Sequence, residues 1–202
     1  MTAFGLLFPA NSVLEKVMSE KLSHTAVIAV DFQNDCIEPT GAWPIFNKKS
    51  LLDNAGVALS ACRRAGIPII YTQHWLAPRG VDAWRDEPLD GRRPLHSVAV
   101  AAGAEIHPFL APQPGDIIVR KQRFSAFYET NLDLILRHMR VEHVIMLGVW
   151  SEACFETTVW DALWREYRIT IVKEACGTAT ELMHKTAMLD LANWLDGGEI
   201  LD

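Results

Sequence analysis

Residues 25–31 read Thr-Ala-Val-Ile-Ala-Val-Asp, a continuous apolar run that ends at a carboxylate. A run without polar alternation is typical of a parallel strand that is buried on both faces of a sheet. Asp31 therefore lies at the carboxyl end of the predicted strand. A strand of this kind requires further strands beside it and helices on both faces.

Five further apolar runs of the same kind follow along the chain. They occupy residues 67–71, 117–119, 143–147, 169–172 and, more weakly, 200–201. Between the runs, apolar residues recur at helical spacing, most clearly over 51–62 and 132–139. This alternation predicts a doubly wound α/β/α sandwich with a six-stranded, mostly parallel sheet in the strand order 3-2-1-4-5-6.

The size and composition of the chain indicate one folded domain. Its 202 residues are 50% hydrophobic, which suffices for one sizeable core. We predict an N-terminal extension over residues 1–22 and a single domain over 23–202. No stretch approaches the ~20 consecutive apolar residues of a membrane span, so we predict no membrane partner.

Charge and cysteine usage narrow the class of protein further. The formal net charge is −6 and no stripe of Lys and Arg stands out, which argues against a nucleic-acid partner. The four cysteines contain no CxxC pair and no zinc-type spacing with histidine. Free thiols of this kind are typical of a reducing compartment, so we predict a cytoplasmic protein.

The segment from Trp75 to Gly115 differs from the rest of the chain. It is rich in Pro, Gly, Arg and Asp, and its one short apolar stretch is 98–102. A loop of this length in a compact domain usually covers a site or a partner.

Three residues of reactive type follow predicted strands. Asp31 ends the first strand, Lys121 lies just past the third, and Cys154 lies in the turn 148–154 after the fourth. Ligands of open parallel sheets bind beyond the carboxyl ends of the strands, where the strand order reverses. Each residue alone has an ordinary structural interpretation, as a turn residue, a solvated charge or a small core residue. Their shared placement predicts a catalytic group of Asp31, Lys121 and Cys154.

Four motifs then resemble those of the isochorismatase-like hydrolases, which include nicotinamidases, N-carbamoylsarcosine amidases, biuret hydrolases and ureidoacrylate hydrolases. The motifs are Ala-Val-Asp-Phe-Gln-Asn-Asp at 29–35, Lys-Gln-Arg-Phe-Ser-Ala-Phe at 121–127, the turn 148–154, and Lys-Glu-Ala-Cys-Gly-Thr at 173–178. The resemblance extends over nearly the whole chain from about Thr25. Any one motif is weak evidence, whereas their order and spacing together are specific.

The resemblance implies a cysteine hydrolase that acts on C–N bonds other than peptide bonds. Cys154 would attack the carbonyl carbon of a small amide, ureido or carbamoyl group and form a thioester, while Asp31 accepts and returns the proton. A helix N-terminus and Lys121 would lower the pKa of the thiol below its usual ~8.5. The backbone N–H groups of Trp150 and Cys154 would form the oxyanion hole, with a cis peptide bond between Val149 and Trp150.

The resemblance and the residue types also suggest what contacts the substrate. The predicted substrate-binding residues are Phe32, Gln33, His74, Trp75, Phe124, Trp150 and Phe155. No cofactor and no metal are predicted, because metal-dependent relatives carry an Asp-x-His motif where this chain has Thr72-Gln73-His74. This departure disfavours a nicotinamidase.

Two other functions remain open alongside the amidohydrolase. True isochorismatases cleave a vinyl ether and need no thiol nucleophile, so Cys154 argues against that activity. A noncatalytic, oligomeric binding protein on the same fold would have no chemical need for all three reactive residues.

The predicted helix that begins near Ser151 carries two apolar stripes. One contains Phe155, Val159 and Ala162 and can face the sheet, and the other contains Trp160, Trp164 and Tyr167. The second stripe is more aromatic surface than a monomer normally exposes. We predict that it forms the interface of a homodimer or homotetramer, together with the N-terminal segment 4–9, although a covering loop is an alternative.

Overall fold

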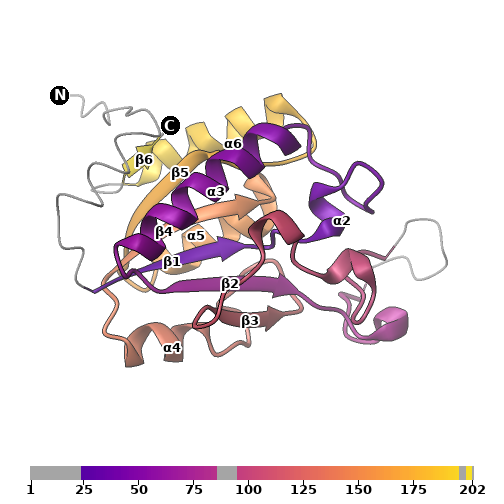
Figure 1. Cartoon of the computed structure of the whole chain (residues 1–202), viewed down its shortest axis with the longest axis horizontal. Helices are drawn as coiled ribbons and strands as arrows, with labels where there is room; N and C mark the ends of the chain where they lie inside the picture. Colours follow the sequence, from indigo (N-terminus) through magenta and orange to yellow (C-terminus); the bar gives the residue numbers. More distant parts are fainter. Residues whose placement is uncertain (1–23, 86–94, 196–198, 202) are drawn as a thin grey trace.

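The computed structural model describes residues 24–85, 95–195 and 199–201. It contains one six-stranded sheet in the order β3-β2-β1-β4-β5-β6, and every neighbouring pair is parallel (Figure 1). The strands are β1 (Thr25–Val30), β2 (Ile69–His74), β3 (Ile117–Lys121), β4 (His143–Val149), β5 (Arg168–Gly177) and β6 (Glu199–Leu201). The predicted fold class and strand order are confirmed.

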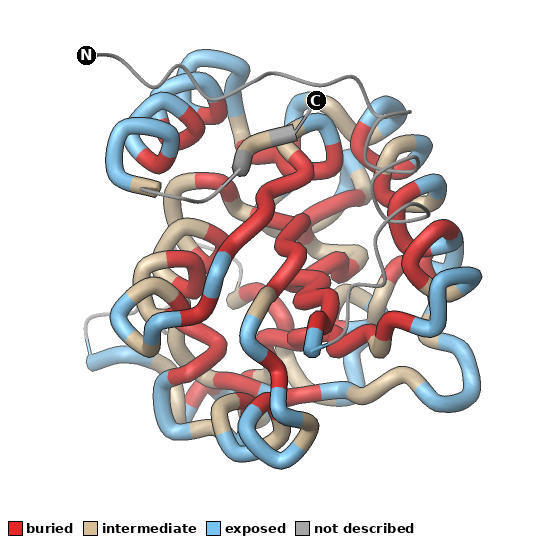
Figure 2. Tube along the Cα trace, turned by 90° about the vertical axis from the view of Figure 1, so that its left-hand side faces the viewer, coloured by how far each residue is buried: buried red, intermediate tan, exposed pale blue. Residues whose placement is uncertain are grey.

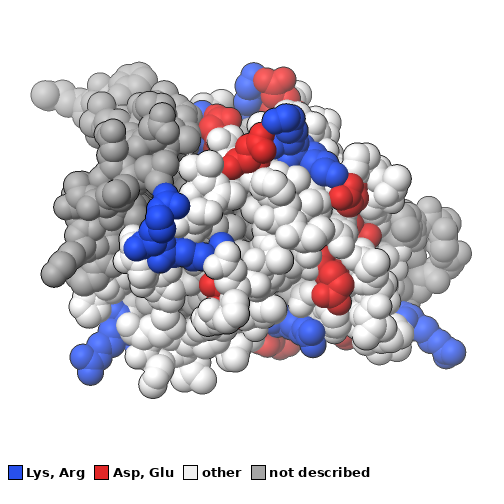
Figure 3. All heavy atoms as spheres, in the orientation of Figure 1, with Lys and Arg blue, Asp and Glu red and all other residues white. Residues whose placement is uncertain are grey.

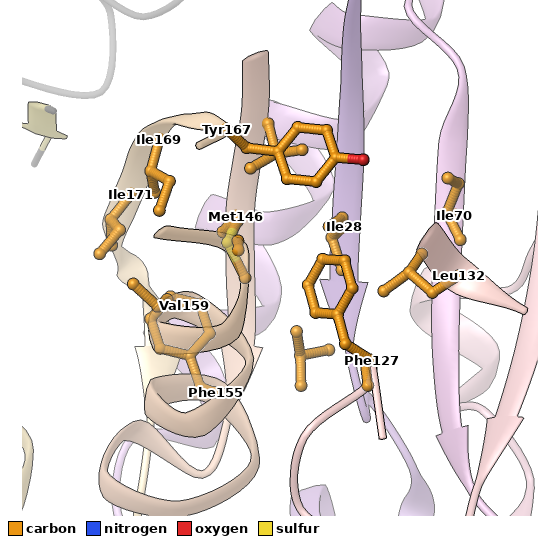
Figure 4. Packing of buried hydrophobic residues seen from close by; sticks show 14 of the residues in the cluster. Ile28, Ile70, Phe127, Leu132, Met146, Phe155, Val159, Tyr167, Ile169 and Ile171 are labelled. Carbon is orange, nitrogen blue, oxygen red and sulfur yellow. The ribbon is translucent and has the colours of Figure 1, made fainter. Parts of the chain in front are cut away.

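Helices cover both faces of this sheet and leave two hydrophobic cores. The longer helices are α3 (Lys48–Arg64), α4 (Leu132–His138), α5 (Glu156–Leu163) and α6 (Glu181–Trp194), and α2 (Asn34–Ile37) is a single turn. One core packs α3 against the sheet. The other packs α4, α5 and α6 against the opposite face, and part of it is drawn in Figure 4.

Strand β1 supplies alternate side chains to the two cores, as the apolar run predicted. Val27 and Ala29 belong to the core under α3, whereas Ala26, Ile28 and Val30 belong to the other core. All five are 0% exposed. Figure 2 shows the burial along the chain, with buried strands inside and exposed helical turns outside.

Two strands extend further than the apolar runs indicated. β2 begins at Ile69 and continues to His74 because Thr72, Gln73 and His74 pair with β3 although they are polar. β5 continues to Gly177 and pairs again with β4 after a register shift. Polar residues can continue a strand after its apolar run has stopped. The apolar pattern therefore predicted the carboxyl ends of β2 and β5 too early in the sequence.

The described parts of the long segment 75–115 fold back over the carboxyl end of β1. Ile106 forms an antiparallel bridge with Gln33, and the N–H of His107 donates to the carbonyl of Phe32 at 2.7 Å. Asp35 accepts the N–H of Ser97 at 2.6 Å. The predicted covering role therefore has a structural basis in residues 95–107.

The second aromatic stripe is only partly as predicted. Trp164 is 72% exposed and stacks on Trp160, with 5.8 Å between ring centroids. Tyr167 is buried instead, and its hydroxyl donates to Asp133 at 3.1 Å. The prediction was wrong for Tyr167 because α5 ends at Leu163, so helical spacing no longer applies. Residues 1–22 and the segment 4–9 lie outside the described residues.

The helices and one face of the surface bear on the predictions about membrane and charge. Within the described residues, every helix is too short or too polar to cross a bilayer. On the face drawn in Figure 3, Lys and Arg side chains lie among Asp and Glu side chains, so this face carries both signs of charge.

Candidate active site

The three reactive residues predicted from sequence meet at the carboxyl ends of β1, β3 and β4. Asp31 directly follows β1, Lys121 is the last residue of β3, and Cys154 follows β4. The Nζ atom of Lys121 lies 2.6 Å from Oδ2 of Asp31. A carboxylate oxygen of Asp31, the thiol sulfur of Cys154 and a ring nitrogen of His74 all lie within 4.8 Å of one another.

The backbone after β4 brings Cys154 to this place. Gly148 has a φ of 139°, and a Cβ there would lie 2.2 Å from the carbonyl oxygen of Val30, so only glycine allows this approach of β4 to β1. The Val149–Trp150 peptide bond is cis, as the resemblance implied. Residues 151–155 then form a π-helical turn, closed by a 3.1 Å bond from the N–H of Phe155 to the carbonyl of Trp150. Such turns are frequent at functional sites.

Asp31 and Lys121 form a buried ion pair. Lys121 is 0% exposed and Asp31 is 2% exposed. Burial works to lower the pKa of Lys121, but attraction to Asp31 and Cys154 outweighs it, and the pKa is raised. Lys121 therefore stays charged, and its Nζ also donates to the carbonyl of Arg123 at 3.1 Å.

The thiol of Cys154 is not a resting thiolate, which corrects the expectation from sequence. Burial, with a smaller contribution from Asp31, raises its pKa to about 12, although Lys121 acts in the opposite direction. A thiol with a pKa raised in this way is mostly protonated at pH 7. Attack by Cys154 thus requires a base that removes the proton as the bond forms, and Asp31 is within reach.

A small pocket that is open to solvent lies beside the thiol. Its lining includes Asp31, Gln33, Cys36, Trp43, His74, His96, Ser97, Val149, Trp150, Ala153 and Cys154. His74 is 5% exposed, and burial, followed by the charges of Lys121 and Arg123 and by His96, holds its pKa well below the usual 6.5. Its imidazole is therefore neutral at pH 7 and can accept or donate a hydrogen bond.

Three of the predicted substrate-binding residues lie elsewhere. Phe32 is fully buried in the core under α3, and Phe155 is fully buried in the opposite core beside Val159 (Figure 4). Trp75 lies under the guanidinium of Arg120, 3.9 Å from the ring centroid. The prediction was wrong for all three because each follows a site residue in sequence but points its side chain to another face.

Gln33 does line the pocket, but its side-chain amide is hydrogen-bonded to backbone groups. It donates to the carbonyls of His74 and Ala104, each at 2.7 Å, and accepts the N–H of His74 at 2.8 Å. These bonds join the ends of β1 and β2 to the covering loop. Gln33 therefore shapes the pocket wall.

Phe124 lies in a second hollow of about 250 Å³ that shares His74 and His96 with the first. Its ring meets Trp84 edge to face, with centroids 4.7 Å apart. Of the predicted substrate-binding residues, Gln33, His74 and Trp150 line the pocket beside the thiol, and Phe124 lines its neighbour.

The site also contains residues that sequence reasoning missed. Trp43 stacks on His96 with ring centroids 3.9 Å apart, and His96 meets His74 edge to face at 4.6 Å. Ser97 is fully buried in the same pocket. These residues belong to loops without a periodic pattern, so the length of the segment 75–115 was the one signal for His96 and Ser97, and no signal pointed to Trp43.

Asp31, His74 and Cys154 together offer three donor atoms of the kind that bind metals. The Nζ atom of Lys121 lies 2.6 Å from Oδ2 of Asp31, and the hydroxyl of Thr72 donates to Oδ1 at 2.6 Å. An adjacent ammonium group repels a second cation. The donor set therefore fits a proton-transfer site better than a metal centre.

Fold and site together define a doubly wound α/β protein with a reactive thiol pocket at the switch point of its sheet. Residues 25–202 match the family model described as the isochorismatase domain, so the chain belongs to this family. The resemblance predicted from the four motifs is thereby confirmed.

Individual relatives differ in their stated activities. A "Probable inactive nicotinamidase" from Arabidopsis thaliana is 29% identical over 180 residues, which cover 87% of this chain and 92% of the relative. The ureidoacrylate amidohydrolase RutB from Caulobacter segnis is 29% identical over 190 residues, which cover 84% of this chain and 80% of the relative. The crystal structure of an isochorismatase family protein from Desulfovibrio vulgaris has a TM-score of 0.82 and 25% identity, and the match covers 89% of this chain and 94% of that chain.

Proposed function

We propose that the protein is an amidohydrolase that cleaves a small amide, ureido or carbamoyl C–N bond through a thioester on Cys154. The observation that carries this proposal is the buried thiol within 4.8 Å of the Asp31 carboxylate, which is itself paired with Lys121 at 2.6 Å. The related ureidoacrylate amidohydrolase supports the same class of substrate.

In this mechanism Asp31 takes the proton of Cys154 as the sulfur attacks the carbonyl carbon. The backbone N–H groups of Trp150 and Cys154 hold the oxyanion, and such donors are worth roughly 3 to 4 kcal/mol each. Asp31 then returns the proton to the departing amine. Water hydrolyses the thioester and restores the thiol. The Lys121 ammonium group lies beside the Asp31 carboxylate throughout, 2.6 Å from Oδ2.

The unpartnered polar atoms of the pocket support a small substrate with its own hydrogen-bonding groups. Nδ1 of His74, Oγ of Ser97 and Nε1 of Trp150 are buried and have no hydrogen-bond partner among the described residues. Leaving such atoms unpaired costs free energy, and a bound amide or urea would pair with them. The predicted substrate contacts at His74 and Trp150 are retained here, and Ser97 is added to them.

A panel of small amides, ureas and carbamoyl amino acids, assayed for ammonia release, tests the proposal. Turnover of at least one compound that is lost in Cys154→Ala supports it.

The relative described as inactive favours a second candidate, a noncatalytic binding protein on the same fold. Saturable binding of panel compounds without any product would support that candidate and contradict the hydrolase.

Metal removal is expected to leave the activity unchanged. Thr72 replaces the aspartate of the metal-dependent motif, and its hydroxyl is committed to Asp31. Exhaustive chelation followed by the ammonia assay should give the same rate, and elemental analysis should find less than about 0.1 transition metal per chain. One tightly bound metal per chain, with activity lost on its removal, contradicts this expectation.

We also propose that the protein is a cytoplasmic homo-oligomer and that Trp164 lies in its interface. All four cysteines are buried and unpaired, which is consistent with a reducing compartment. Trp164 is 72% exposed, and Leu182, Leu189 and Trp194 of α6 are exposed as well. An aromatic side chain buries about 150 to 250 Å² at an interface, so a second copy of the chain would gain from covering this surface.

Trp164→Glu is expected to dissociate the oligomer. A charge in the middle of an apolar interface is desolvated without a partner. Light scattering of the wild type should give a dimer or tetramer, and the variant should give a mass near 22.6 kDa with reduced activity, because α5 follows the turn that carries Cys154. Leu134→Glu is the matched control, since Leu134 is 71% exposed on α4. A wild-type mass of one chain at micromolar concentration contradicts the interface.

A further inference from the structure

We propose that Thr72 is a positioning residue that orients Asp31 for proton transfer, an inference that rests on the proposed function. The Thr72 hydroxyl donates to Oδ1 of Asp31 at 2.6 Å and accepts the backbone N–H of Asp31 at 3.2 Å. One side chain of β2 thus holds both the backbone and the carboxylate of the residue that ends β1.

Asp31 needs such support because its backbone is in an uncommon conformation. Its φ is 50°, in the left-handed region that residues other than glycine seldom adopt. The N–H points to Thr72, and the carbonyl accepts the N–H of Gln33 at 2.7 Å. Both backbone groups of Asp31 are therefore bonded in a way that keeps the carboxylate at the strand end.

The two carboxylate oxygens have different partners, which leaves the carboxylate little freedom to turn. Lys121 lies 2.6 Å from Oδ2, and Thr72 lies 2.6 Å from Oδ1. A carboxylate held on both oxygens keeps its remaining lone pairs directed at one place. With Cys154 within 4.8 Å, that place is the thiol and the proton that it must release.

Thr72 acts through Asp31 and not on the substrate. It is 0% exposed, and the pocket lining among the described residues does not include it. The titratable groups that face Asp31 are Lys121 from β3, Cys154 from the π-helical turn, His74 from β2 and Cys36 from α2. Thr72 carries no charge, so its removal changes the orientation and hydrogen bonding of Asp31 without removing a charge.

Thr72→Val is expected to lower kcat by about tenfold to a hundredfold and to leave KM nearly unchanged, because substrate does not touch Thr72. Thr72→Ser keeps the hydroxyl and should restore most of the rate. Thr170→Val is the matched control, because Thr170 is a buried strand threonine whose hydroxyl bonds to His143 at 2.9 Å.

Alkylation of Cys154 by iodoacetamide separates this inference from the proposed function. The reaction needs no substrate but requires the same proton removal, so Thr72→Val should slow it several-fold at pH 7, and Thr72→Ser should not. A thermal melt checks that each variant is folded. Wild-type kcat and alkylation rate in folded Thr72→Val overturn the inference, as does equal loss in Thr72→Ser. A wild-type protein whose Cys154 does not react at all instead overturns the proposed function.

Discussion

Cys154→Ala is expected to reduce hydrolysis by about 10⁴-fold or more, the largest effect on activity of any single substitution. The thioester cannot form without the sulfur, and the remaining groups supply only binding and oxyanion stabilisation. Cys154→Ser should be nearly as inactive, because a hydroxyl is a weaker nucleophile and is harder to deprotonate. Ammonia release from the substrate found in the panel is the measurement.

The stability of Cys154→Ala is expected to change little. Alanine removes one buried sulfur that no disulfide uses, which costs about 1 kcal/mol and shifts the melting temperature by roughly 2 to 4 °C. Cys62→Ala is the control, since Cys62 is 1% exposed in the core under α3 and far from the pocket lining. This control should lose comparable stability and keep full activity. Wild-type turnover in either Cys154 variant would show that the thiol is not the nucleophile.

Most of the fold was predictable because a parallel sheet leaves a strong trace in sequence. Runs such as 25–30 are buried on both faces and contain no polar residue after Thr25, which distinguishes them from half-exposed strands. The strand order was taken as the usual order of doubly wound sheets, and the rule that ligands bind where the order reverses then brought Asp31 and Cys154 together. The same rule predicted that Lys121 reaches the site from β3, which lies two strands from β1 in the sheet.

The side on which a residue lies was harder to predict than its place along the chain. Phe32 follows Asp31 directly, yet the left-handed backbone of Asp31 turns Phe32 into the core. Phe155 follows Cys154 in a π-helical turn, whose spacing differs from that of the α-helix assumed for it. Local backbone conformations of this kind are not encoded in hydrophobic periodicity.

The pKa of the Cys154 thiol also depends on side-chain packing, which could not be predicted from the sequence. A cation and a helix start near Cys154 suggested a lowered pKa, but complete burial and the nearby Asp31 raise the pKa to about 12. Thr72 was noted for lacking the carboxylate of a metal motif, whereas its hydroxyl bond to Asp31 depends on the register of β1 and β2. The pKa of Cys154 and the Thr72–Asp31 hydrogen bond both depend on how closely residues of different strands approach one another.

The Asp31–Lys121 pair is expected to dominate the stability of the site. Lys121→Met should lower the free energy of unfolding by about 3 to 5 kcal/mol, because it leaves the Asp31 carboxylate buried without a counter-ion. Urea unfolding followed by circular dichroism measures this change. Lys49→Met is the control, since Lys49 also pairs with an aspartate at 2.6 Å but is 92% exposed, and a solvent-screened pair of this kind contributes little to stability.

Adding Asp31→Asn to Lys121→Met should recover part of the stability and none of the activity. Asparagine removes the unpaired charge and can still accept the Thr72 hydroxyl, so the double variant should unfold at a higher urea concentration than Lys121→Met alone. A coupling of several kcal/mol in this double-mutant cycle is the expected result. A coupling energy below about 1 kcal/mol would mean that water reaches the pair, which would contradict a buried Asp31–Lys121 ion pair.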